Sequence, residues 1–427
     1  MRLRYLQIIV FIVAIGCFDK SLRAEEILSW QGCIKEAAKN HPDLIAAQEE
    51  VKQSEAAKQE TASGLFPQID GQVSASTAQT ASSPGKNTKS DSYSYGVTGT
   101  QLLFDGIKTI NDVKAAQQNI VAAKQGFRFT STTVRFRLRS AFIDLLTAQE
   151  MLRITEEIYN IRRGNLELIS LRYASGLEHK GALLTAEADL ADAKYGVSKA
   201  KRELEVAQGA LVKEMGRSKL TPIYAQGDFK VMDSASTKPD FKLLTKDNPS
   251  LQQLIAQKNS AEFSLKSAYG NFSPQLSGQA GANKTGANWA PRGDQWNLGL
   301  ILSMPIFEGG LRTAQVSGAR ALVKQLEENE RSTRDGLILT LQQSWAALQD
   351  GLENVSVQEK VLTATQERSK IGQAQYSIGF VNFDNWTIIE DNLVKAKKTY
   401  LDAQASVLLL EAKWIQAKGE TLEYAKE

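Results

Sequence analysis

Cysteine and histidine are scarce in this chain. Its 427 residues include two cysteines, Cys17 and Cys33, and two histidines, His41 and His179. A structural metal site takes three or four such ligands at short spacings, and the two histidines lie far apart in sequence. No Ser-His-acid set is apparent either. We therefore expect a protein that is not an enzyme and that holds no metal and no cofactor.

Long apolar runs are also scarce. The only one extends from Leu6 to Phe18 and follows two arginines. Its length of about 13 residues is too short to cross a bilayer as a helix. Together with the polar "KSLRA" behind it, the run predicts a secretory signal peptide over residues 1–24, and a first transmembrane helix is the alternative. We favour cleavage after Ala24, while the weak lipobox "AIGC" leaves lipidation of Cys17 open.

The mature chain has no excess of either charge. Residues 1–24 hold four basic residues and one acidic residue, so the totals of 51 and 48 become 47 and 47 without them. A chain without net charge has no general attraction to nucleic acid, and none is expected as a partner. If only Cys33 remains after cleavage, no intramolecular disulfide can form. An exported protein of this size must then depend on packing or oligomerisation.

The chain contains one unit twice. The stretch "GLFPQIDGQ" from Gly64 returns as "NFSPQLSGQ" from Asn271. Motif pairs are spaced first by 207 and then by 203 residues: HPDL with NPSL, Pro67 with Pro274, Phe104–Gly106 with Phe307–Gly309, and Gly176 with Gly379. The change of four indicates an insertion in a loop, and we place it in the polar residues 77–91. The sequence is a tandem duplication.

Each repeat is predicted to contain a helix, two strands, a very long helix, a tight turn and a long return helix. The predicted bounds are 25–215 and 241–420 for the repeats, 216–240 for a linker, 421–427 for a tail, 67–105 and 274–307 for two β-hairpins, and 106–171, 179–215, 309–375 and 382–420 for the long helices. The first long helix contains no proline and could extend about 100 Å. Such a length indicates that the protein spans something.

The return helices carry a heptad pattern. Apolar residues recur at alternating spacings of three and four in both repeats: Leu190, Ala193, Val197, Ala200, Leu204, Ala207 and Leu211, then Leu393, Ala396, Tyr400, Ala403, Val407, Leu410 and Trp414. This pattern predicts long antiparallel helices that pack as a coiled coil. The frequent alanines indicate that the helices approach closely.

The segments between the Pro-Gln and Phe-acid-Gly motifs alternate as strands do. We expect Pro67 and Pro274 to end the incoming helices. In the last strand, one face carries Leu298, Leu300 and Leu302, which are predicted to face lipid. Aromatic residues gather near the strand ends: Phe66, Phe104, Phe272, Trp296 and Phe307. The pattern is typical of a membrane β-barrel, with a soluble hairpin as the alternative.

Four strands in one chain are too few to close a barrel. Two chains would give eight strands, whose interior is nearly filled by side chains, and three would give twelve with a lumen. The Pro-Gln motif would then mark, in each repeat, the point where a periplasmic helix ends and the chain enters the membrane.

These motifs resemble those of the TolC-like outer-membrane factor family. The similarity covers essentially the whole mature chain and rests on three pairs of motifs: Pro67-Gln68 and Pro274-Gln275, "PIFEGG" at 305–310 with "LLFDGI" at 102–107, and the turns 173–177 and 376–380. The one departure is a leucine pair, Leu102-Leu103, where the second repeat has proline. The resemblance implies an α+β membrane protein, with a trimeric 12-stranded outer-membrane β-barrel continued by an antiparallel helical coiled-coil barrel across the periplasm.

The resemblance also implies function and partners. Such proteins are homotrimeric exit ducts that open on docking to a periplasmic adaptor (membrane fusion) protein and an inner-membrane efflux pump or ABC transporter, in efflux or type I secretion. A structural coiled-coil envelope protein, such as an adhesin stalk or spacer, is the alternative. The expected adaptor-docking residues lie in the two tight turns: Tyr173, Gly176, Leu177, Tyr376, Gly379 and Phe380.

A periplasmic gate is expected at the start of the second return helix. In TolC-like proteins the constriction involves acidic residues there, whereas the matching positions here are Asn385 and Ile388, and Asp384 is the nearest carboxylate. Three copies of Asp384 around a narrow opening would attract cations. The alternative is that Asp384 caps the helix.

Overall fold

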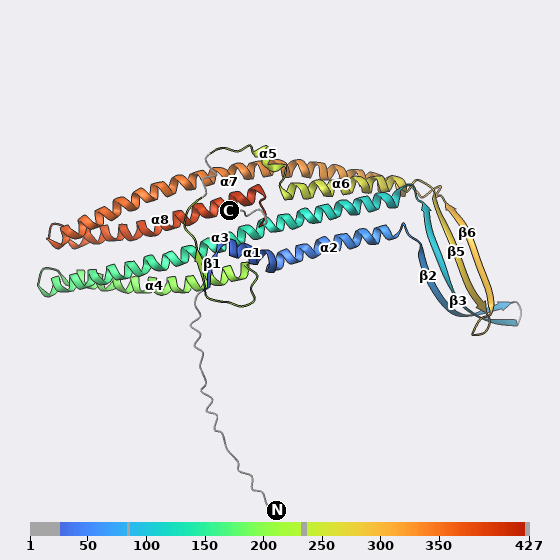
Figure 1. Ribbon diagram of the computed structural model, residues 1–427, viewed down its shortest axis with the longest axis horizontal. Helices are drawn as coiled ribbons and strands as arrows, with labels where there is room; N and C mark the ends of the chain where they lie inside the picture. Colours follow the sequence, from blue (N-terminus) through green and yellow to red (C-terminus); the bar gives the residue numbers. More distant parts are fainter. Residues whose placement is uncertain (1–25, 83–85, 232–236, 423–427) are drawn as a thin grey trace, which may run out of the picture.

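The protein is a long body of helices with a β-sheet at one end (Figure 1). The structure, a computed structural model, describes residues 26–82, 86–231 and 237–422. The predicted signal peptide, with Cys17 and Ala24, lies outside these residues, as does most of the predicted tail. Two helical hairpins lie at the end of the body that is far from the sheet.

The same order of elements occurs in both halves of the chain. The first half contains β1 (Glu26–Ser29), α1 (Trp30–Asn40), α2 (Pro42–Ser63), β2 (Gln68–Ser82), β3 (Lys86–Phe104), α3 (Lys108–Ala174) and α4 (Lys180–Glu214). The second contains β4 (Ile223–Gln226), α5 (Phe241–Thr245), α6 (Pro249–Gly270), β5 (Gln275–Gly286), β6 (Gly293–Ser303), α7 (Leu311–Ser377) and α8 (Phe383–Lys418). Helices α3 and α7 each have 67 residues, which corresponds to about 100 Å. The predicted α+β fold with a tandem repeat is confirmed.

None of the helices in the described part of the chain has an apolar stretch long enough to cross a membrane.

The four long strands form one antiparallel sheet in the order β2-β3-β5-β6. A smaller parallel pair joins β1 to β4, beside the helices. The insertion lies within the predicted residues 77–91, because Ala78 opposite Ser90 corresponds to Thr285 opposite Gly293. The prediction of a loop over this stretch is wrong, because residues 77–82 and 86–91 pair as strands, with Thr77 opposite Asp91. The extra residues of the first repeat therefore lengthen paired strands, since β2 and β3 have 15 and 19 residues against 12 and 11 in β5 and β6.

The prolines of the Pro-Gln motifs follow the helices after a short turn. Helix α2 ends at Ser63 and α6 at Gly270, and a short turn separates each helix from its proline. In the first turn, the amides of Leu65 and Phe66 donate to carbonyls of the last helical residues. Pro67 and Pro274 directly precede β2 and β5. Their fixed φ suits an extended strand entry. The hydrogen bonds of the turn continue to Phe66 and Ser273, directly before the prolines, and that the prolines stop the helices stays a prediction.

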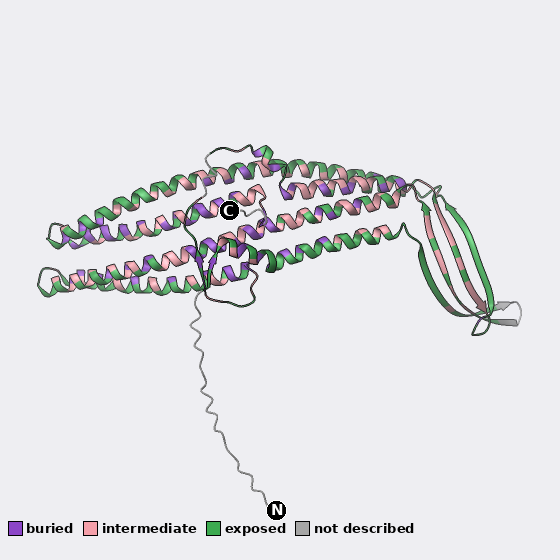
Figure 2. Ribbon diagram, in the orientation of Figure 1, coloured by how far each residue is buried: buried purple, intermediate pink, exposed green. Residues whose placement is uncertain are grey.

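The main hydrophobic core surrounds the middle of α3. Leu138, Phe142 and Leu145 of this helix pack with Cys33 of α1 and Leu211 of α4. Figure 2 shows that buried residues are concentrated along the helical body, whereas in the sheet the outer strands β2 and β6 are mainly exposed and the inner strands β3 and β5 are partly intermediate. Burial raises the pKa of the Cys33 thiol to about 12, so this cysteine is expected to be chemically inert.

Candidate functional site

The sheet has one apolar and one polar face. Residues directly opposite each other in an antiparallel sheet point to the same side, and the register therefore sorts the side chains. The apolar face includes Ile69, Val73, Tyr95, Val97, Ala280, Ala282, Trp296, Leu298 and Leu300, with Lys284 and Asp294 on it at the end far from the helices. The polar face includes Gln68, Asp70, Gln72, Ser74, Thr98, Thr100, Gln279, Asn283, Gln295 and Asn297, with Leu102 and Ile301 on it at the end near the helices. Both repeats contribute to both faces.

The apolar face is open to its surroundings. Leu298, Leu300 and Leu302 are 78%, 72% and 68% exposed. A shallow groove on this face is lined by Ile69, Ala280 and the first two of these leucines. An apolar surface on one side of a sheet and hydrogen-bonding side chains on the other is the distribution found where a sheet separates lipid from water.

The strands join the long helices through a left-handed bend. In the first repeat, Gly106 and Ile107 have φ of 69° and 66°, and in the second, Gly309 and Gly310 have φ of 59° and 87°. Gly106 also has no room for a side chain, because a Cβ there would lie 2.3 Å from the Cβ of Ser273. The Phe-acid-Gly motif therefore serves the turn from strand to helix, beside the half-exposed Phe104 and the exposed Phe307.

The two turns farthest from the sheet have the same backbone geometry. The amide of Leu177 donates to the carbonyl of Arg172 at 2.8 Å, and that of Phe380 to Gln375 at 2.8 Å. Gly176 and Gly379 adopt φ of 72° and 81°, as the αL position of a Schellman motif requires. Both turns expose apolar side chains: Leu177 is 67% exposed in the first, and Ile378 and Phe380 are 75% and 82% exposed in the second.

The tyrosines of these turns differ, although the motif around them is the same. Tyr173 is 40% exposed, whereas Tyr376 is 1% exposed. The side chain of Tyr376 stacks on Trp386 and donates to the carboxylate of Glu178 in the other turn. We predict Tyr376 as an adaptor contact, but its side chain is buried and packs against Trp386 on the inner side of the turn. A comparison of the repeats could have indicated this, because Trp386 and Glu178 replace the apolar Leu183 and Val381.

The first turn of α8 holds the predicted gate residues. Its N-cap is Asn382, whose side-chain oxygen accepts from the amide of Asn385 at 3.0 Å. Asp384 lies in the first turn with an exposed side chain. The alternative reading, in which Asp384 caps the helix, is therefore wrong, because Asn382 already fills that position.

Ion pairs that the sequence did not reveal join the two helical hairpins. The guanidinium of Arg162 on α3 lies 3.5 Å from Asp189 on α4 and also contacts Asp391 on α8. Burial, partly offset by Arg162, raises the pKa of Asp189. Lys397 of α8 contacts Glu157 of α3. Because the side chain of Arg162 is almost buried, this contact couples the repeats in the half of the body that leads to the turns.

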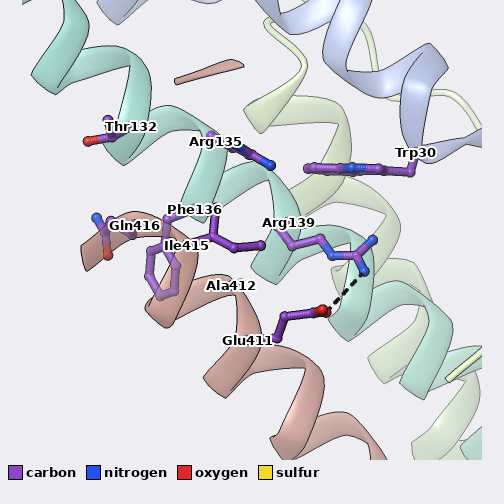
Figure 3. Close-up of a pocket in the computed structure, with 9 residues that line it drawn as sticks. All are labelled: Trp30, Thr132, Arg135, Phe136, Arg139, Glu411, Ala412, Ile415 and Gln416. Atoms are coloured by element: carbon purple, nitrogen blue, oxygen red, sulfur yellow. Dashed lines mark ion pairs between the residues drawn. The ribbon is translucent and has the colours of Figure 1, made fainter. Parts of the chain in front are cut away.

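A small cavity lies where α1, α3 and α8 meet (Figure 3). The guanidinium of Arg139 lies 5.0 Å from the ring of Trp30 and 3.9 Å from a carboxylate oxygen of Glu411. The cavity has a volume of about 20 Å³, which suffices for little more than a water molecule. Arg139 and Glu411 pair with each other in this cavity. The cavity therefore lies at a contact between helices and is too small for a substrate.

The described residues contain no group of three or more side chains suited to hold a metal ion. His41 and His179, the two histidines, both cap helices, accepting from Asp43 and Ala182 respectively. Neither lies in a cluster of ligands.

Comparison with known proteins agrees with this architecture. Residues 33–217 and 242–420 match the family described as outer membrane efflux protein. The outer membrane efflux protein BepC of Brucella suis is 20% identical over 91% of this chain and 84% of its own length. The cation efflux system protein CusC of Escherichia coli K12 is 20% identical over 86% of this chain and 81% of its own.

Solved channel structures share the fold. The crystal structure of CusC has a TM-score of 0.80 at 20% identity and covers 90% of this chain and 91% of its own. The CmeC outer membrane channel of Campylobacter jejuni has a TM-score of 0.81 at 18% identity and covers 91% and 84%. Because the family match includes both repeats and most of the chain, the protein belongs to the outer membrane efflux protein family and is an outer-membrane protein that extends into the periplasm.

Proposed function

We propose that three copies of this chain form the exit duct of a tripartite efflux or type I secretion system. The observation that carries the proposal is the two-faced sheet with two free edges at the end of helices about 100 Å long. A membrane barrel would continue into a helical tunnel, and cargo would pass through both without chemical change.

The number of strands favours three copies. Four strands per chain give eight in a dimer, where side chains nearly fill the interior, and twelve in a trimer, which leaves a lumen. In the trimer the apolar face, with Leu298, Leu300 and Leu302, contacts outer-membrane lipid, and the polar face lines the channel. The alternative of a stalk or spacer needs no sheet with one face suited to lipid.

The far end is proposed to dock a periplasmic adaptor, through which the duct meets an inner-membrane efflux pump or ABC transporter. Leu177 and Phe380 supply apolar contacts at the tips of the two turns. A wide aqueous tunnel selects little, so the transporter chooses the cargo. Asp384, near the same end, is proposed to contribute to the gate.

Two measurements on the purified full chain test the duct. We expect trimers that dissociate on heating and that conduct ions across a planar lipid bilayer. A monomer without conductance would exclude a duct and favour a structural envelope protein.

A further inference from the structure

The two histidines stand where the second repeat has asparagine. The motif spacings of 207 and 203 residues relate His41 to Asn248 and His179 to Asn382. All four side chains cap a helix by accepting a hydrogen bond from a backbone amide of its first turn: His41 Nδ1 from Asp43 at 3.2 Å, Asn248 from Ser250 at 3.0 Å, His179 Nδ1 from Ala182 at 3.1 Å, and Asn382 from Asn385 at 3.0 Å. The repeats therefore share the cap positions but differ in the chemistry of the cap.

The difference lies in how the two kinds of cap respond to acid. An imidazole nitrogen accepts a hydrogen bond only while it carries no proton, and a protonated imidazole has two donors and no acceptor. Histidine is the side chain that changes charge between about pH 5 and 8. The amide oxygen of asparagine accepts over that whole range. The caps of the first repeat can therefore be lost in mild acid, whereas those of the second repeat cannot.

His41 lies in a buried cluster of charges. It is 5% exposed, and its Nε2 lies 3.5 Å from the carboxylate of Glu214 on α4. Arg137 of α3 and Lys213 of α4 pair with the same carboxylate, and Arg137 also contacts Asp43 of α2. A proton on His41 would break its cap but would strengthen the contact with Glu214. Because these effects oppose each other, we do not expect His41 to act as a switch.

His179 is in a different position, because 67% of its side chain is exposed at the distal turn. One carboxylate oxygen of Glu178 lies 3.8 Å from His179 Nε2. The other oxygen of Glu178 accepts from Tyr376 of α7, and Arg172 of α3 lies over the Tyr376 ring. Lys180, the first residue of α4, adds a positive charge next to His179. Ion pairs at such exposed positions contribute little, so the loss of the cap is the larger effect of a proton here.

The first turn of α4 lacks the acidic residue that supports α8. Gly181 leaves room for the imidazole, because a Cβ there would lie 3.0 Å from His179 Nδ1. Its counterpart in α8 is Asp384, whose charge suits a helix N-terminus, whereas a positive charge on His179 is unfavourable there. Without the cap, the Ala182 amide would be left with the carbonyl of His179 as its acceptor, at 3.1 Å. The start of α4 therefore depends on the uncharged form of His179.

We propose that His179 is a pH-sensitive cap: its protonation loosens the first turn of α4, while the first turn of α8, capped by Asn382, stays ordered. The two distal turns, which have the same backbone geometry, then respond differently to acid. Leu177, the proposed docking contact of the first repeat, lies two residues before His179. Acid therefore changes the docking end of the first repeat and leaves that of the second. This inference goes beyond the proposed duct and does not depend on it.

Hydrogen–deuterium exchange of the purified full chain tests the cap. Exchange is measured at about pH 8 and about pH 5, on either side of the range in which histidine titrates, and is corrected for the effect of pH on the intrinsic rate. We expect the protection of residues 180–186 to fall about fivefold at the lower pH, which corresponds to the usual cap contribution of about 1 kcal/mol. Residues 383–389 in the same samples are the internal control, and their protection should stay constant.

Two variants separate the cap from other effects of acid. His179→Asn copies the second repeat, and we expect full protection at both pH values. His179→Ala removes the cap, and we expect the lower protection at both. Equal protection of the wild-type turn at both pH values would overturn the proposal, as would an acid-induced loss that persists in His179→Asn, where His41 is the remaining histidine.

An equal loss of protection in both turns would show general destabilisation by acid and would also overturn the proposal. None of these results depends on whether the chain forms a duct, which the conductance of the wild type decides.

Discussion

The ring of Tyr376 lies flat on the indole of Trp386, with the ring centroids 4.4 Å apart and the planes 2° apart. This stack closes the second helical hairpin. The Tyr376 hydroxyl donates to Glu178 at 2.8 Å, and the Arg172 guanidinium lies 4.8 Å from the ring. Burial, and then the hydrogen bond to Glu178, raise the pKa of Tyr376 well above its usual value. Arg172 also donates to the carbonyl of Ser377 at 3.4 Å, so the side chains of Tyr376 and Arg172 both link the two distal turns.

Tyr376→Phe keeps the stack and removes the link to Glu178. A hydrogen bond to a charged group contributes about 1.5–3 kcal/mol, so we expect a lower melting temperature of the isolated protein. In planar bilayers we expect higher conductance, because the hairpin tips separate more easily. Tyr173→Phe is the matched control, since Tyr173 occupies the same place in the first repeat and is 40% exposed. Equal conductance of both variants and the wild type would show that the link does not restrain the tips.

The sequence predicted the elements whose patterns are local. The alternation of Leu298, Leu300 and Leu302 places them on one face whatever the neighbouring strand is, and the register confirms that they share that face. The glycines at 176 and 379 likewise predicted sharp reversals, because a left-handed residue ends a helix without help from distant parts of the chain.

Features that depend on the partner segment could not be predicted. Tyr173 and Tyr376 stand in the same motif, yet only Tyr376 meets a tryptophan from α8 and a carboxylate from the other turn. The pairing of Arg162 with Asp189 and Asp391 depends on three helices that meet only in the folded chain. The polar residues 77–91 predict a loop, but the strands continue there: Thr77 lies opposite Asp91 on the face of Val73 and Tyr95, and its hydroxyl donates to the Asp91 carboxylate at 2.6 Å.

We expect membrane insertion to depend on the apolar face of β6. Leu300→Arg places a charge on the face proposed to contact lipid, at a cost of roughly 2–4 kcal/mol near the midplane. We expect fewer trimers in the outer membrane, as measured by fractionation. Asn297→Arg adds the same charge to the same strand on the polar face, and we expect normal insertion. Equal amounts of both variants in the membrane would contradict the assignment of the faces.

We expect adaptor docking to depend on exposed apolar residues of the distal turns, Leu177 and Phe380. Leu177→Asp or Phe380→Asp replaces an apolar contact by a charge that must be desolvated, and we expect loss of transport with trimers intact. His179→Asp is the matched control, because it adds a negative charge at the same tip and aspartate also caps a helix well. Normal transport in both apolar variants would remove these residues from the docking surface.

The N-terminal strand is held by Arg217. Its guanidinium donates to Glu26 at 2.6 and 2.9 Å and to Glu36 at 2.5 and 2.7 Å. Hydrogen bonds from Arg217, more than its charge alone, hold the pKa of Glu26 below its usual value of 4.5. A lowered pKa in the folded state means stabilisation that is complete above pH 4.5 and lost as the pH falls through the folded-state pKa.

We therefore expect Arg217→Met to lower the melting temperature near neutral pH and to have little effect in acid. Arg153→Met is the control, because Arg153 pairs with Glu150 on the surface of the same helix, where ion pairs contribute little. If the melting temperatures of the wild type and Arg217→Met differ by the same amount at neutral pH and below pH 4.5, the ion pair does not stabilise the strand.

The ion selectivity of the channel tests whether Asp384 contributes to the proposed gate at the far end of the proposed duct. The side chain is exposed in the first turn of α8, and the capping position belongs to Asn382. In a trimer three such carboxylates would surround the opening and favour cations. We expect Asp384→Asn to shift the reversal potential under a salt gradient toward that of an unselective pore. Asn382→Ala is the control, because loss of a cap costs about 1 kcal/mol of stability but leaves the charge in place. If Asp384→Asn leaves the reversal potential unchanged, the carboxylate only interacts with the helix dipole, a contribution of roughly 0.3–1 kcal/mol, and the gate depends on other residues.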